Sequence, residues 1–330
     1  MFRQALSFAI LASLTTYTAA EVTPSAQLTL DSSNMLEGGI EHGHTLRGLL
    51  DLSLEAHISA IKGATFFAQA LLQQGDQGSE FTGDIQGYSN IDSHDFESIF
   101  EIWYGQTLLN DSLMLKLGWL DGNSDFAATE HGGEFINSSM GFSPTIFAMP
   151  TYPDTVLAVN AVYDLSQTHQ LAFGVYDGQD TDDFAEQFFI GQYQHRFADT
   201  TLRLGAWQHS QSNEQRGWFA SLDQALSSNW ALLSQLGVSH EGTVEVDQHV
   251  SLGLVKYNSF NREKDNSGFA ISSVHVEAQR DNETAYEWFY QYQVNEYLSL
   301  KPDLQYIHKP SADSRIDDAL VFTLRLVANL

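Results

Sequence analysis

The chain has 330 residues, of which 43% are hydrophobic and 12% aromatic, and its formal net charge at pH 7 is -27. A charge this negative argues against nucleic acid as a partner, because phosphate binding requires clustered Lys and Arg. The chain contains no cysteine, which excludes disulfides and thiolate metal sites and suits an exported protein.

Residues 1–20 have the pattern of a secretory signal peptide. Arg3 supplies a basic first part, "ALSFAILASL" is a short apolar core, and "TAA" offers small residues for cleavage after Ala20. A buried N-terminal helix is the alternative, which the polar stretch after Ala20 disfavours. No other segment reaches the ~18 apolar residues of a membrane helix. We therefore expect residues 21–330 to be exported. They would reside in the periplasm, in the medium, or in the outer membrane as a barrel.

Apolar and polar residues alternate along most of the remaining chain, with the period of a β-strand. In "TLRGLLDLSLEAHI" (45–58), Leu46, Leu50 and Leu54 fall on one side while Asp51 and Glu55 fall on the other. The same pattern recurs in "SLMLKLGWL", "AYEWFYQYQVNEYLSLKPDLQYIHKP" and "ALVFTLRLVANL". Segments of about ten residues with one apolar and one polar face are typical of transmembrane barrel strands.

The breaks between these segments alternate between two kinds along the chain. Seven short breaks lie near residues 59–63, 110–111, 164–168, 198–200, 227–228, 258–266 and 295–297. Eight longer or acidic breaks lie near 33–43, 75–96, 121–154, 178–185, 210–215, 241–247, 280–284 and 309–317. This alternation predicts an all-β fold, a single transmembrane antiparallel β-barrel of about 16 strands, with short periplasmic turns and long external loops.

A closed sheet is the β-structure that satisfies every backbone group in lipid. Its apolar face would meet hydrocarbon, and its polar face would line a wet lumen. Aromatic residues near strand ends are expected at the two membrane interfaces, namely Tyr104, Trp119, Trp230, Tyr257, Tyr292 and Tyr306. The alternative is a soluble β-sandwich with the apolar face as its core. That fold would not explain why short and long connections alternate along the chain.

Several stretches resemble the carbohydrate-selective porins of Gram-negative bacteria, the OprB-type family. They are "GDIQGYSNID" (83–92), "EIWYGQTLLNDSLMLKLGWLDGNSDFA" (101–127), "FINSSMG" (135–141), "PTYP" (150–153), "FYQYQVNEYLSLKPDLQYIHKP" (289–310) and "ALVFTLRL" (319–326), spread over essentially the mature chain. The sequence departs from the family at Gly105, where "WYEQ" usually carries an acidic residue. The resemblance implies a sixteen-stranded barrel that passes small sugars across the outer membrane by diffusion, with no cofactor and no covalent chemistry.

The longest break, 121–154, is expected to fold into the pore, because it mixes polar residues with four phenylalanines and loops of this length are usually functional or disordered. Candidate lumen residues on the substrate pathway are Arg47, Asp51, Glu55, Glu97, Glu101, Trp103, Lys116 and Asp121. A one-residue slip would reverse the faces within a strand. Charged groups would bind sugar hydroxyls, and Trp103 would contact the apolar face of a sugar ring. Binding must be weak enough for release. The alternative is that these residues stiffen the wall through ion pairs.

The expected partners are small sugars, outer-membrane lipid and lipopolysaccharide, and the barrel is expected as a monomer or a homotrimer. The acidic breaks either hold divalent cations that bridge to lipopolysaccharide or are simply solvated. We expect no cofactor and no metal site, and no enzyme, since no H-E-x-x-H, G-x-S-x-G or phosphate-cradling motif is present. A general or cation-preferring porin is the main alternative function. A barrel-type acyl hydrolase and a soluble exported sugar-binding protein are remote ones.

Overall fold

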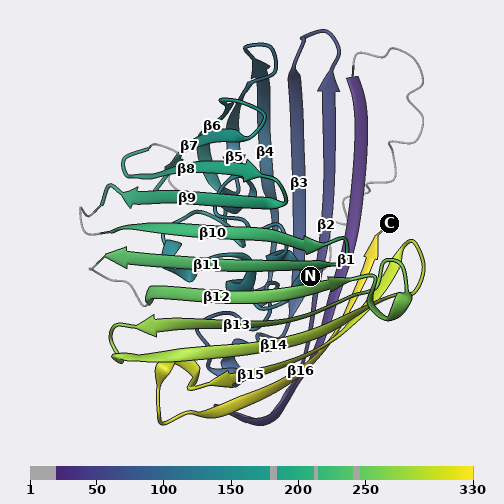
Figure 1. Ribbon diagram of the computed structural model, residues 1–330, viewed down its shortest axis with the longest axis vertical. Helices are drawn as coiled ribbons and strands as arrows, with labels where there is room; N and C mark the ends of the chain where they lie inside the picture. Colours follow the sequence, from purple (N-terminus) through teal and green to yellow (C-terminus); the bar gives the residue numbers. More distant parts are fainter. Residues whose placement is uncertain (1–19, 179–183, 212–214, 241–245, 330) are drawn as a thin grey trace, which may run out of the picture.

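The computed structural model describes residues 20–178, 184–211, 215–240 and 246–329. These residues form sixteen antiparallel strands in one closed barrel, in which each strand pairs with its neighbours in the chain (Figure 1). The strands are β1 (Ala20–Gly39), β2 (His44–Ile58), β3 (Ala64–Gly75), β4 (Phe96–Leu108), β5 (Leu113–Leu120), β6 (Val156–Asp164), β7 (His169–Asp177), β8 (Gln187–Phe197), β9 (Thr200–His209), β10 (Arg216–Ser227), β11 (Trp230–His240), β12 (Val246–Tyr257), β13 (Asn266–Val276), β14 (Asp281–Gln293), β15 (Leu298–His308) and β16 (Asp317–Asn329). The pairing of β1 with β16 closes the barrel. The predicted fold class and strand number are therefore confirmed.

The predicted signal peptide lies outside the described residues, except for Ala20, which begins β1. Among the described residues, no helix is long and apolar enough to cross a membrane. The helices that do occur are single turns in the connections between strands: α1 (Ser79–Thr82), α2 (Gly122–Asp125), α3 (Ser138–Gly141), η1 (Gly132–Glu134), η2 (Pro144–Ile146), η3 (Ser259–Asn261) and η4 (Pro310–Ala312).

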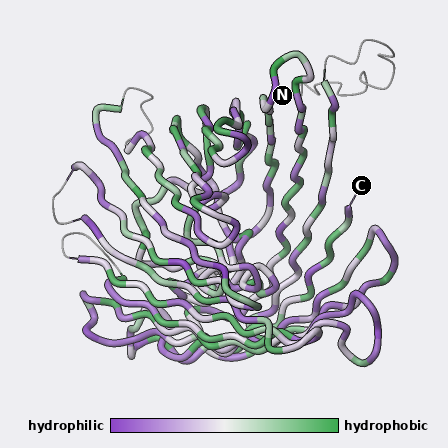
Figure 2. Tube along the Cα trace, turned by 45° about the horizontal axis from the view of Figure 1, so that its top comes forward, coloured by the Kyte–Doolittle hydropathy of each residue, from purple (hydrophilic) through white to green (hydrophobic). Residues whose placement is uncertain are grey.

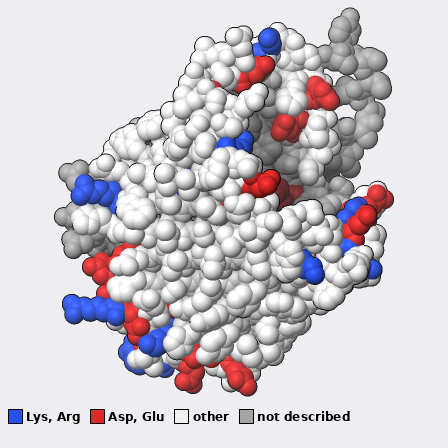
Figure 3. Space-filling view, in the orientation of Figure 1, with Lys and Arg blue, Asp and Glu red and all other residues white. Residues whose placement is uncertain are grey.

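The two faces of the sheet differ in polarity, and Figure 2 shows hydrophobic and hydrophilic residues alternating along the strands. On β15 and β16, Leu304 and Leu324 are 38% and 41% exposed on the outer face, whereas Gln305 and Thr323 are fully buried on the inner face. This arrangement is the inverse of a soluble protein and is the one expected of a barrel in lipid. In Figure 3 the middle of the visible outer surface is almost free of charged side chains, which gather toward the strand ends.

The connections follow the predicted order, and the predicted sorting by length holds apart from three of them. The two longest, residues 76–95 and 121–155, lie at the same end of the barrel. At that end, however, the connections 40–43 and 277–280 are short, because β1 continues to Gly39 and β14 begins at Asp281. At the opposite end, residues 258–265 form a longer connection that contains η3. Successive connections in an antiparallel barrel must lie at opposite ends, so the end at which each lies was predictable. The length of each connection was not.

Five of the six aromatic residues expected at the interfaces are partly exposed on the barrel, with exposed fractions of 38–42%. Tyr257 is the exception, and its expected outward position is wrong. It follows the fully buried, inward-facing Val255 by two residues, so it faces the lumen. There its hydroxyl lies 2.8 Å from Nδ1 of His131, a residue of the connection 121–155.

Candidate functional site

The connection 121–155 is tied to the inner wall of the barrel by two carboxylates. Glu287 on β14 accepts the backbone N–H groups of Ile136 and Asn137 at 2.7 and 3.1 Å. Asp223 on β10 accepts those of Glu130 and His131 at 3.1 and 3.3 Å. Each carboxylate thus satisfies two consecutive backbone donors that would otherwise be buried without a partner.

Apolar side chains of the same connection pack against the wall. Phe126, Phe135, Met140 and Ile146 have exposed fractions of at most 1%. The ring of Phe135 meets that of Phe289 edge to face, with 5.0 Å between centroids. Burial of each such side chain contributes about 1.5–3 kcal/mol. The connection is therefore held as firmly as a piece of core, and it fills the side of the lumen next to β6–β15.

A second connection, residues 76–95, also folds inward, which was not predicted from the sequence. Glu283 on β14 accepts the backbone N–H groups of Ile85 and Gln86 at 2.9 and 3.2 Å. The two inserted connections are also bonded to each other, because the N–H of Asn90 donates to the carbonyl of Ile136 at 2.7 Å. Burial raises the pKa of Tyr88 in this segment to about 12, and its backbone carbonyl accepts from a wall glutamine at 2.7 Å. The lumen is thus narrowed by both segments together.

The acidic residues of the segment 76–95 bind backbone amides. Asp92 accepts the N–H groups of Gly78 and Ser79 at 2.9 and 2.8 Å, and Asp95 accepts that of Gly75 at 2.9 Å. Among the described residues, no group of three His, Asp or Glu could hold a metal ion. The second acidic stretch, near 178–185, falls largely on residues 179–183, which lie outside the described part of the chain.

Most of the cationic side chains described on the inner wall are neutralised by carboxylates. Four wall cations have a carboxylate oxygen within 4 Å, in the pairs Arg325–Asp31, Arg47–Asp92, Arg203–Asp223 and Lys116–Asp125. Lys301 instead donates to the carbonyl of Glu134 at 2.5 Å and lies 4.7 Å from the centroid of the Phe289 ring. Over the residues that the structure describes, the wall therefore offers polar groups without a patch of free positive charge.

An aromatic pair lies on the wall beside the Lys116–Asp125 pair. The rings of Phe67 on β3 and Trp103 on β4 stack with 5.2 Å between centroids, and Nζ of Lys116 lies 4.8 Å from the Trp103 ring. A Cβ atom at Gly105 would lie 3.0 Å from that ring, so the glycine leaves room for the indole to lie along the wall. Asn160 completes the group by donating to Asp125 at 2.8 Å.

The structure places Arg47, Asp51 and Glu55 on the inner face of β2, as the alternation predicts. Arg47 is 3% exposed, and it donates to the carbonyls of Gly75 and Asp76 at 2.5 and 2.7 Å, so it anchors the inserted segment. Asp51 accepts from a β3 glutamine at 2.8 Å, and the side chain of Glu55 is 45% exposed. Both side chains are partly exposed on this inner face.

Glu101 and Asp121 meet at the root of the connection 121–155. Glu101 is only 6% exposed and accepts the backbone N–H of Asp121 at 3.0 Å. The Asp121 carboxylate caps α2 by accepting from the N–H of Asn123 at 3.0 Å and from the hydroxyl of Ser124 at 3.1 Å. Burial raises the pKa of Asp121, and these hydrogen bonds oppose the shift. Both carboxylates position the connection, which favours the wall-stiffening interpretation at these two positions.

Glu97 faces the outside, so its expected place in the lumen is wrong. A β-bulge in β4 shifts the pairing with β3 between Gln69 and Ala70, and residues before Phe100 reverse their faces as a result. Glu97 pairs with Leu72, which is 36% exposed on the outer face. The neighbouring Ile99 is 66% exposed for the same reason.

Known proteins resemble this chain in sequence and in fold. The family model "Carbohydrate-selective porin, OprB family" matches residues 41–198 and 180–330. Porin B of Pseudomonas aeruginosa is 26% identical over 34% of this chain, and the match spans about a third of that relative's length (32%). A high-pH structure of Pseudomonas putida OprB aligns with a TM-score of 0.83 at 17% identity over 94% of both chains. A mutant of the Rh. blastica porin aligns with a TM-score of 0.65 at 12% identity, over 94% of this chain and all of its own. The chain belongs to the OprB family of carbohydrate-selective porins.

Proposed function

We propose that the protein is an outer-membrane porin through which small neutral sugars diffuse passively. Residues 1–20 would be the export signal, and residues 21–330 the barrel. Family membership and the apolar belt on the outer face support a place in the outer membrane. Its surroundings would then be outer-membrane lipid and lipopolysaccharide, around a monomer or a homotrimer. No catalytic role is proposed, because the family consists of channels.

The observation that carries the sugar preference is the aromatic pair Phe67–Trp103 beside the Lys116–Asp125 pair. An indole face would contact the apolar side of a pyranose ring, while the ammonium and the carboxylate would bond to its hydroxyls. Because the ammonium and the carboxylate neutralise each other, they can bind a neutral solute without retaining an ion. Weak contacts then let the solute leave. The finer proposal is therefore that Asp51, Glu55, Trp103 and Lys116 line the pathway.

Ion current through a single channel tests this proposal, because a sugar in the narrow part of the lumen blocks ions. We expect glucose to reduce the current in the unaltered channel at lower concentrations than in the variant Trp103→Ala. Glu97→Ala is the matched control, since Glu97 lies on the outer face of the same strand. Equal glucose block in the unaltered channel and in Trp103→Ala would remove Trp103 from the pathway.

A general or cation-preferring porin is the second candidate, and the net charge of -27 favours it. Such a channel would pass solutes according to size and charge alone. It would therefore show no block by glucose beyond that caused by an equally sized polyol.

A further inference from the structure

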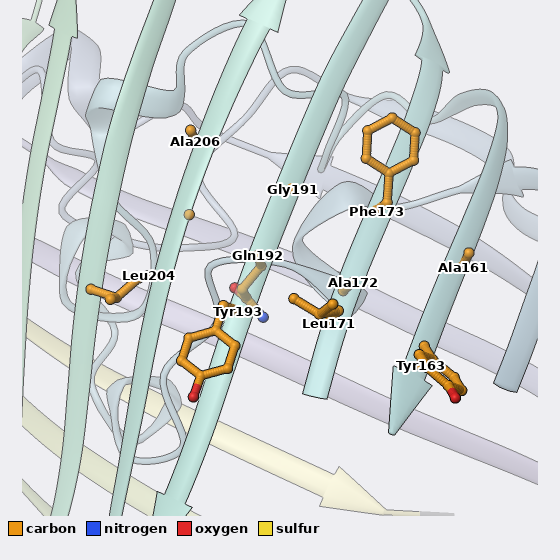
Figure 4. A pocket seen from close by; sticks show the side chains of 11 residues that line it. Ala161, Tyr163, Leu171, Ala172, Phe173, Gly191, Gln192, Tyr193, Leu204 and Ala206 are labelled. Atoms are coloured by element: carbon orange, nitrogen blue, oxygen red, sulfur yellow. The ribbon is translucent and has the colours of Figure 1, made fainter. Parts of the chain in front are cut away.

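The outer face of β6–β9 carries a groove of about 630 Å³. Figure 4 shows the side chains of Phe173 and Leu171 on β7, Tyr193 on β8 and Leu204 on β9 around it, with small residues between them. Two rows across the sheet build the groove. The first row pairs Ala161 with Phe173, Phe173 with Gly191, and Gly191 with Ala206. The second pairs Tyr163 with Leu171, Leu171 with Tyr193, and Tyr193 with Leu204.

The glycine in the first row is not required by the backbone or by packing. A Cβ atom on Gly191 would have Phe173 Cδ2 as its nearest neighbour, at 3.9 Å, which is ordinary contact. Gly205, which faces the lumen from β9, differs, because a Cβ atom there would lie 2.1 Å from the ring of Phe219. The space above Gly191 is therefore open toward the outside, where a larger apolar side chain would fit.

The groove ends at a stack of four rings near the turns at residues 165–168 and 198–199. His169 stacks on Tyr193 with 5.9 Å between centroids and on His195 with 4.2 Å, and His195 stacks on Phe197 with 5.0 Å. The Nδ1 atom of His169 lies 2.7 Å from the Tyr193 hydroxyl and 3.1 Å from Nδ1 of His195. Within the described part of the chain, the Nε2 atom of neither histidine has a hydrogen-bond partner.

We propose that this groove binds one phospholipid of the periplasmic leaflet, with an acyl chain over Gly191 and its phosphate at His169 and His195. The inference rests on the proposed function, because the groove faces lipid only in a membrane-inserted barrel. In the contact between the two Nδ1 atoms one ring donates and the other accepts, so the accepting ring carries its N–H on Nε2 and can donate it to a phosphate oxygen. The apolar floor of the groove thus matches an acyl chain, and its polar end matches the phosphate of the same lipid. Tyr193 belongs to both the floor and the polar end.

A second copy of the chain fits this face less well. Phe173 and Leu204 project from it with exposed fractions of 52% and 47%, and a facing barrel would need a matching ridge between them. Such a contact would also cover the imidazole nitrogens, which is costly in an apolar environment unless the facing barrel supplies a hydrogen-bond partner.

Native mass spectrometry of the full barrel with phosphatidylethanolamine or diacylglycerol tests the proposal. We expect one retained phosphatidylethanolamine per barrel, and about tenfold less retention in Gly191→Leu, whose side chain fills the groove. The double variant His169→Phe with His195→Phe keeps the ring stack. It should lose the preference for phosphatidylethanolamine over diacylglycerol. Ala68→Leu is the matched control, since Ala68 is a small residue on the outer face of β3, paired with Leu54.

Three results would overturn the proposal. The first is unchanged lipid retention in Gly191→Leu, and the second is equal retention of the two lipids by the unaltered barrel. The third is that Gly191→Leu loses a protein oligomer and not a bound lipid. Sugar flux measured on the same Gly191→Leu protein separates this proposal from the function. Unchanged flux with lost lipid supports the groove alone. Lost flux in every protein, Ala68→Leu included, would instead count against the porin function.

Discussion

The Glu287 carboxylate on β14 accepts the backbone N–H of Ile136, a residue 151 positions earlier in the chain, at 2.7 Å. This bond and the neighbouring one from Asn137 fasten the middle of an inserted connection to the far wall of the barrel. The same arrangement recurs at Asp223 and Glu283. Buried wall carboxylates that bind consecutive backbone amides therefore set the shape of the lumen.

Removal of this anchor should loosen the lumen. In Glu287→Ala the two amides lose a charged acceptor, and hydrogen bonds to charged groups contribute about 1.5–3 kcal/mol each. We expect a lower midpoint of unfolding in guanidinium chloride and larger fluctuations of the open-channel current. Glu287→Gln keeps one acceptor oxygen and the side-chain volume. Its unfolding midpoint and current fluctuations should therefore lie between those of the unaltered protein and those of Glu287→Ala. A quiet current in Glu287→Ala would show that the apolar contacts alone hold the connection.

The Arg325–Asp31 pair should control the ion preference of the channel. Arg325 donates Nε–H and Nη2–H to the two oxygens of Asp31 at 2.7 Å each, and both side chains are almost fully buried. Breaking such a pair costs about 3–5 kcal/mol and leaves an uncompensated cation buried at the inner wall. Asp31→Asn should therefore be less stable and shift the reversal potential in a KCl gradient toward anion preference.

The exposed pair of Arg315 and Asp313 provides the control for that experiment. The Arg315 side chain is 83% exposed, so solvent screens the pair. Asp313→Asn should leave both the unfolding midpoint and the reversal potential unchanged. An equal shift of the reversal potential in the two variants would assign the effect to total charge and not to the lumen.

Asp84 in the segment 76–95 should make stability depend on pH. Burial raises the pKa of its carboxyl to about 6, and the nearby Asp92 adds to the shift. At this carboxyl the folded state therefore binds more protons than the unfolded state between pH ~4 and ~6, so the contribution of Asp84 to stability falls as pH rises through this window. Asp84→Asn should flatten the dependence of the thermal midpoint on pH between 4 and 6. A dependence identical to that of the unaltered protein would assign it to other groups.

The strands and their two faces were predictable from the sequence, because a strand has a side-chain period of two and lipid imposes an apolar outer face. The alternation places Arg47, Asp51, Glu55 and Lys116 inside, where the structure has them. It fails at Glu97, because one extra residue in the bulge reverses the faces and leaves no mark in the pattern.

The interior of the lumen was predictable only in part. The length and the phenylalanines of residues 121–154 indicated an inserted segment, but nothing local indicated that residues 76–95 insert as well. Their anchors, such as the bond between Gln86 and Glu283, join residues 197 positions apart, and strand periodicity carries no information on such pairs. The sequence left open whether the acids of that segment hold cations or are simply solvated, and it did not indicate that Asp92 and Asp95 accept backbone amides within the segment and at its edge.

Liposome swelling with the refolded barrel tests the central claim most directly. The vesicles would receive glucose, a disaccharide and an amino acid of similar size to glucose in parallel. A sugar-selective pore predicts fast swelling with glucose and clearly slower swelling with the amino acid, a difference that shrinks in Trp103→Ala but not in Glu97→Ala. Rates that follow solute size alone, in the unaltered barrel and both variants, would contradict selectivity for sugars.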